Sequence, residues 1–307
     1  MRLRFPRGRT GRGGQIFPRP SSGAGARLAD NLTSMTTLQI LLTVLAYGVT
    51  VVALALLTVR VRQLLATYKK AQPDPTRSND KGARLANMLK EVLGHTKMLN
   101  FTGTGIAHWF VMIGFGALLG TLVTAYGQLI SPEFALPIIG HFVVYEFFAE
   151  AIAWLTGIGI ITLIGIRQVT RLKPERANRF SGSGMGKAYY VEATILAIVF
   201  CVFALRGLEG ALAGKESWNW HYAISWPAVL FFDSWSQIAI ENAIVIVATL
   251  KIVTSMTWFI VIAANLTMGI AWHRFLAFFN IYYKRNIDKP ALGALPEMLS
   301  KGKPVNF

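Results

Sequence analysis

The chain has 307 residues, of which 53% are hydrophobic and only 15% are charged. With a mean hydropathy of +0.44, this composition excludes an ordinary soluble domain and predicts an integral membrane protein. A net charge of +16 is typical of nucleic-acid-binding proteins, but the basic residues gather in alternate loops between apolar segments, which excludes nucleic acid as the partner.

The residues before the first apolar segment, 1–34, are rich in Gly, Pro and Arg. Two interpretations stay open, a basic disordered tail or an untranslated stretch with the start at Met35. The second is favoured because the tail would lie on the outer side of the membrane, whereas Lys and Arg concentrate in cytoplasmic loops.

Five apolar segments are long enough to cross a bilayer, whose core of about 30 Å takes roughly 20 helical residues. They are residues 37–59, 106–130, 142–166, 188–213 and 252–272, and they predict an all-α integral membrane domain, a five-transmembrane-helix bundle over residues 35–285. Three charged residues of the fourth segment, Glu192, Arg206 and Glu209, are expected at its two ends, within reach of the interface. The apolar residues 238–250 are expected to prolong the fifth helix beyond the outer face, with Lys251 near that interface.

The loops set the orientation of the bundle. Lys and Arg are abundant between the first and second segments and between the third and fourth, and these loops are predicted to be cytoplasmic. The loops 131–140 and 214–242 have almost none and face outward. The N-terminus is therefore predicted outside and the C-terminus in the cytoplasm, where residues 286–307 form a linker.

Histidines are the side chains that bear on chemistry. An imidazole in lipid is a functional candidate by default, although a hydrogen-bonded packing histidine is the alternative. His108 lies just inside the cytoplasmic end of the second segment and His273 just beyond that of the fifth, so the two share one depth, as a bis-histidine haem requires. His95 would not share a face with His108 on a continuous helix. His141 and His221 fall on the outer side.

At this point the residues carry a resemblance to a family. The stretch GIAHWFVMIGF at 105–115, with GIAWHR at 269–274 and NIYY at 280–283, resembles the haem b membrane domain shared by the respiratory nitrate reductase gamma subunit and heterodisulfide-reductase-like proteins. Over residues 35–285 the chain is most similar to the N-terminal membrane part of actinobacterial iron–sulfur reductases. The resemblance implies one haem b with His108 and His273 as axial ligands, in the plasma membrane of a bacterium.

The same resemblance limits the number of haems. The family's outer ligand pair falls on Leu118 and Ser255, which cannot hold haem iron, so a single haem is implied. A second haem at His141 and His221 is the alternative. Arg274, Lys97 and His95 lie at the cytoplasmic interface, where they would contact haem propionates or a quinone oxygen unless they are simply solvated by headgroups.

The predicted function is electron transfer between the quinone pool in the lipid and a cytoplasmic iron–sulfur reductase domain or subunit. Cys201 is the only cysteine, so the chain has no ligand set for a cluster and is expected to be the membrane part of an oxidoreductase, incomplete by itself. The alternative is a cofactor-free membrane anchor or a transporter, against which the absence of a detectable inverted repeat argues.

Overall fold

A computed structural model describes residues 35–71, 74–171, 184–214, 217–285, 299–300 and 303–304 of the chain. Five of the described helices are long and apolar enough to cross a membrane: Thr37–Tyr68, Thr102–Gln128, Val143–Thr170, Met185–Leu212 and Gln237–Ala264. Apolar segments adopt helices in lipid because a helix satisfies its own backbone polar groups. The predicted all-α fold with five spans is confirmed. The two interpretations of residues 1–34 lie outside the described residues, as does most of the predicted linker.

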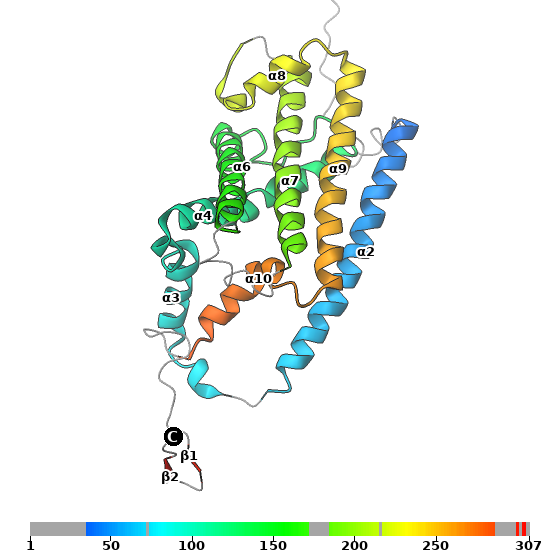
Figure 1. The fold of residues 1–307 in the computed structure, drawn as a ribbon. Helices are drawn as coiled ribbons and strands as arrows, with labels where there is room; N and C mark the ends of the chain where they lie inside the picture. The colour runs from blue at the N-terminus through cyan, green and yellow to red at the C-terminus, as the bar shows by residue number, and fades with distance from the viewer. Residues whose placement is uncertain are drawn as a thin grey trace, which may run out of the picture. The chain divides into compact units, whose positions relative to one another are not determined.

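The spans pack in an order that differs from their order in the sequence (Figure 1). Helix α2 (Thr37–Tyr68) lies along α9 (Gln237–Ala264), α9 packs on α7 (Met185–Leu212), α7 on α6 (Val143–Arg171), and α6 on α4 (Thr102–Ala117). The largest buried apolar cluster joins α2, α7 and α9 with α5 (Leu119–Gln128), which continues α4 after a break at Leu118. Many apolar side chains elsewhere on α2 are exposed, as expected for a helix that faces lipid.

Small residues bring α4 and α6 close together. A Cβ at Gly114 would collide with the side chain of Thr156, and one at Gly159 would lie 2.6 Å from the carbonyl oxygen of Ala107. Glycine at membrane helix interfaces lets two backbones approach in this way. Because α4 touches α6 at Ala107, the next residue of α4, His108, has a fixed height relative to α6.

The fifth span differs from the prediction. It runs over Gln237–Ala264 rather than 252–272, and a turn around Asn265 separates it from α10 (Gly269–Tyr282). The indole nitrogen of Trp272 donates to the carbonyl oxygens of Ile262 and Asn265, both at 3.2 Å, which ties α10 to the end of α9. The apolar stretch predicted to project beyond the outer face is therefore part of the span. Lys251 lies inside that span, 1% exposed, and the prediction that it sits near the outer interface was wrong.

Two helices outside the spans, α3 (Lys81–Leu93) and α10, pack against each other. They lie at the end of the bundle that is predicted to be cytoplasmic from its Lys- and Arg-rich loops, which we call the basic end. Figure 1 shows α10 turning away from the axis of α9 toward α3. The opposite end carries the short helices η4 (Trp220–Tyr222) and α8 (Trp226–Phe232), and α8 packs on α7. We call this second end the outer end, after the orientation predicted from the loops.

Candidate functional site

Three histidines from separate segments meet at the basic end. His108 lies on the second turn of α4, His273 on the second turn of α10, and His95 in the turn that follows α3. The ring centres of His108 and His273 are 6.0 Å apart, and the rings of His95 and His108 stack with centres 5.0 Å apart. The structure thus brings the two histidines predicted from their common depth side by side.

Hydrogen bonds fix which nitrogen of each ring carries its proton. The carbonyl oxygen of Val92 can only accept, so Nδ1 of His95 donates to it at 3.4 Å, which leaves Nε2 of a neutral His95 as an acceptor. That Nε2 lies 2.9 Å from Nδ1 of His108, so His108 donates. Nδ1 of His273 likewise donates to the carbonyl oxygen of Gly269 at 3.3 Å. In neutral rings both His108 and His273 then carry a lone pair on Nε2, the form in which imidazole ligates a metal.

The spacing of the two rings fits axial ligation of one metal ion. Metal–nitrogen bonds of about 2 Å on either side of an ion place the two ring centres roughly 6 Å apart. Within the described part of the chain, no hydrogen bond engages Nε2 of either ring. Partial desolvation, and then the charge of Arg274, lower the pKa of His273 below its ordinary value of 6.5, so the ring is neutral at pH 7.

His95 reaches this cluster because the chain reverses after Gly94, where α3 ends. His95 has a positive φ of 51°, which is unusual for a residue with a side chain. The expectation that His95 and His108 would not share a face assumed one continuous helix, and it was wrong for that reason. His95 is 7% exposed and lies against His108 on the side away from Nε2.

Arg274 is the charged group nearest to the histidine pair in the sequence. Its guanidinium stacks on the rings of Phe115 and Trp258, 4.7 and 4.6 Å from their centres. No carboxylate in the described residues pairs with Arg274, and desolvation lowers its pKa to about 10. A half-buried cation without a counter-ion is a favourable place for an anion. Lys97, predicted at the same interface, instead forms an ion pair with Glu91 at 2.9 Å.

A polar clamp between α3 and α10 holds His273 in place. Arg84 is 3% exposed and donates to the carbonyl oxygens of Tyr282 and Lys284, at 3.0 and 2.8 Å, where α10 ends. A cation at a helix C-terminus satisfies its free carbonyl groups and its dipole. Beside it, Nζ of Lys284 lies 2.6 Å from Oε1 of Glu91 on α3.

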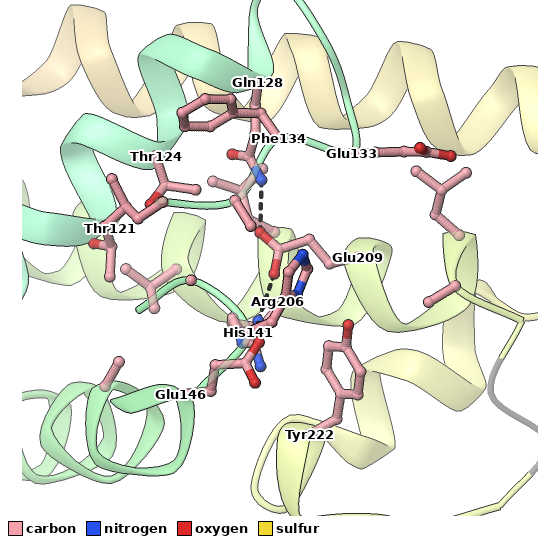
Figure 2. A pocket seen from close by; sticks show the side chains of 18 of the residues that line it. Thr121, Thr124, Gln128, Glu133, Phe134, His141, Glu146, Arg206, Glu209 and Tyr222 are labelled. Carbon is pink, nitrogen blue, oxygen red and sulfur yellow. Dashed lines mark hydrogen bonds and ion pairs between the residues drawn. The ribbon is translucent and has the colours of Figure 1, made fainter. Parts of the chain in front are cut away.

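A second polar cluster lies at the outer end, and it was not predicted from the sequence. Arg206 on α7 forms ion pairs with Glu146 and Glu150 on α6 and with Glu209 on its own helix, at 3.2, 3.1 and 2.6 Å. Figure 2 shows Arg206 with Glu146 and Glu209. Glu192 at the other end of α7 pairs with Arg167 at 2.8 Å. Glu192, Arg206 and Glu209 lie toward the two ends of α7, as expected, but they are held in ion pairs with other side chains. Glu146 and Glu150 were visible as carboxylates on one helical face, but nothing in the sequence indicated their common partner.

Of the two outer histidines, His221 bonds to this cluster and His141 lies beside it. Nδ1 of His221 lies 2.5 Å from Oε2 of Glu146, and His141 lines a cavity beside it. Among the residues that the structure describes, no group of three or more His, Cys, Asp or Glu side chains is arranged to hold a metal ion by itself. A haem, which needs only two axial ligands from the protein, is compatible with that finding.

Searches of protein-family models, of curated proteins and of solved structures found no match for this chain.

Proposed function

We propose that the chain is a cytochrome b-type membrane domain in which His108 and His273 are the axial ligands of one haem b. The observation that carries the proposal is the state of the two rings: they lie 6.0 Å apart and each directs its proton to a fixed partner through Nδ1. Metal-ligating histidines almost always donate the other ring N–H in this way. The resemblance to the nitrate reductase gamma subunit and to actinobacterial iron–sulfur reductases supports the same pair.

The residues around the pair have distinct roles in this proposal. His95 sets the tautomer of His108, and the clamp between α3 and α10 sets the position of His273. Arg274 offers its charge to a haem propionate or to a quinone oxygen at the interface. When bound, haem b supplies a one-electron carrier, and two axial imidazoles leave no open position for oxygen chemistry.

The activity that we propose is electron transfer between the quinone pool and an iron–sulfur domain or subunit on the cytoplasmic side of a bacterial plasma membrane. Cys201, the only cysteine, is buried in α7, so clusters would belong to the partner. The basic end, which holds the histidines, is the end predicted to be cytoplasmic from its Lys and Arg. Electrons would then enter and leave near one face of the membrane.

The experiment is haem quantification on the purified full chain, by pyridine haemochrome and by oxidised and dithionite-reduced spectra. We expect about one low-spin haem b per chain. His108→Ala and His273→Ala should each lose it, whereas His141→Ala and His221→Ala serve as matched controls and should retain it. About two haems per chain would contradict the single-haem count, and none in the wild type would favour the cofactor-free anchor.

His95 gives a sharper version of this test. Because its ring supports His108 without facing Nε2, His95→Ala should keep the reduced spectrum but weaken haem binding by roughly 10–100-fold. Loss of the spectrum in His95→Ala, with His273→Ala unchanged, would make His95 the ligand in place of His273. Reduction of the haem by a quinol analogue then tests the quinone role.

A further inference from the structure

A cavity at the outer end carries chemistry that the proposed function does not use. It has a volume of about 290 Å³ and lies where α5, α6 and α7 meet, below the loop 131–141. Apolar side chains, among them Leu136, Val202 and Leu205, form part of its wall, and Tyr145, Glu146 and Glu209 form another part. That volume is near the lower end of the range for small-molecule sites, about 300–1,000 Å³, so the cavity suits a compact ligand.

Two buried polar atoms in the wall have no partner. Gln128 is 0% exposed, and its Nε2 donates to Oε1 of Glu209 at 2.6 Å, which fixes the orientation of the amide (Figure 2). Its Oε1 makes no hydrogen bond to any described residue, and neither does the buried hydroxyl of Tyr145. Buried polar atoms are nearly always paired, so an unpaired amide oxygen and an unpaired hydroxyl on one cavity wall call for a ligand that donates hydrogen bonds.

The charged side chains around the cavity indicate whether that ligand is positively or negatively charged. Four of the five N–H donors of Arg206 are used by Glu146, Glu150, Glu209 and the carbonyl oxygen of His221. One further buried cation, Lys251, donates to Thr121 at the cavity wall, at 2.8 Å. Four carboxylates, the three bound to Arg206 and Glu133 in the cavity wall, therefore stand against two cations, and His221 adds a charge only when it is protonated.

We propose that this cavity binds a small molecule with a protonated amine, which enters from the outer side. The ammonium group has three N–H donors and no acceptor. It would donate to Oε1 of Gln128 and to the hydroxyl oxygen of Tyr145 while its charge faces Glu209, and the apolar wall would hold its carbon skeleton. An anion would meet the carboxylates, and a neutral alcohol would supply one donor and no charge. This site does not depend on the haem proposal.

The test is titration calorimetry on the full chain in nanodiscs, with empty nanodiscs as the blank. Benzylamine, benzyl alcohol and benzoate have the same ring and differ in charge. We expect benzylamine to bind, benzyl alcohol to bind at least about 10-fold more weakly, and benzoate not to bind. Equal affinity for the amine and the alcohol, or no heat above the blank, would overturn the proposal, the latter because the cavity would then hold solvent only.

Two variants locate the site. Tyr145→Phe removes a hydroxyl that has no protein partner, so the protein should remain at least as stable in thermal unfolding while it binds benzylamine about 10-fold more weakly. Gln128→Met should weaken binding similarly. The matched control is Gln237→Met, because Gln237 also donates to a glutamate, Glu241 at 2.8 Å, but on an exposed surface. Benzylamine binding that is unchanged in both cavity variants would place the amine elsewhere and overturn the proposal.

Discussion

Arg206→Met should be among the most destabilising single substitutions in this protein. The side chain is 12% exposed and bonds to Glu146 and Glu150, which are 5% and 0% exposed. Its removal leaves buried carboxylates without their cation. Each retains another donor, His221 for Glu146 and Ser225 for Glu150, so neither loses all its hydrogen bonds. Of the charge-assisted bonds that are lost, the two to the buried carboxylates Glu146 and Glu150, at about 1.5–3 kcal/mol each, alone give about 4 kcal/mol, within the range of about 3–5 kcal/mol for broken buried pairs.

The free energy of unfolding can be measured by denaturant titration of the protein in mixed micelles. Arg60→Met is the control, because in the part of the chain that the structure describes Arg60 bonds to Gln63 alone, on an exposed face, and it should change stability by less than about 0.5 kcal/mol. In the Arg206→Met background, Glu209→Gln should recover part of the loss, since it removes a charge that no longer has a partner. A loss below about 1 kcal/mol for Arg206→Met, or no recovery in the double variant, would refute this account of the outer cluster.

Two further predictions concern buried charges elsewhere. Lys251→Met should leave stability unchanged or raise it by up to about 2 kcal/mol, because among the described residues Lys251 bonds to Thr121 alone, whose hydroxyl still donates to Leu118; a loss above about 0.5 kcal/mol in the same titration would contradict this. Burial raises the pKa of Glu91, but hydrogen bonds from Lys284, Lys97 and Asn87 outweigh it and bring the pKa below 4.5. The carboxylate therefore contributes stability that is complete above pH 4.5 and is lost as pH falls through the lower, folded value. Wild type should lose thermal stability over that acid range and Glu91→Gln should lose less, and parallel curves would count against the clamp.

The spans could be predicted from the sequence because hydropathy is a local property. Twenty apolar residues in a row have few alternatives in lipid, whatever packs beside them. The common depth of His108 and His273 also followed from local position, since each lies at the same end of its apolar segment. The break at Asn265 was missed because the turn contains only two polar residues, Asn265 and Thr267, inside a long apolar run. It is held by Trp272, a contact that exists only once α10 has folded back.

Which charged residues form ion pairs between helices could not be predicted from the sequence, for a different reason. Glu146 and Glu150 mark one face of α6, but whether Arg206 meets them depends on which helix packs against that face and how α7 is rotated, and the sequence indicates neither. His95 was misplaced for a related reason: only the chain reversal at Gly94 carries it to His108. In both cases the missing information was the direction of a side chain rather than the position of its helix.

The two polar clusters differ in what they leave unpaired, and this difference bears on where a cofactor would bind. At the outer end a single guanidinium, Arg206, pairs with three carboxylates, and the groups left without a hydrogen-bond partner among the described residues of the cavity wall are an amide oxygen and a hydroxyl. At the basic end the groups that remain are two imidazole nitrogens with lone pairs and the guanidinium of Arg274. A haem has an iron that takes two such nitrogens and propionates that take such a cation. In the outer cluster the guanidinium of Arg206 is already bound to three carboxylates, so no cation is left for a propionate. We therefore expect substitutions at His141 and His221 to leave a haem in place while those at His108 and His273 remove it.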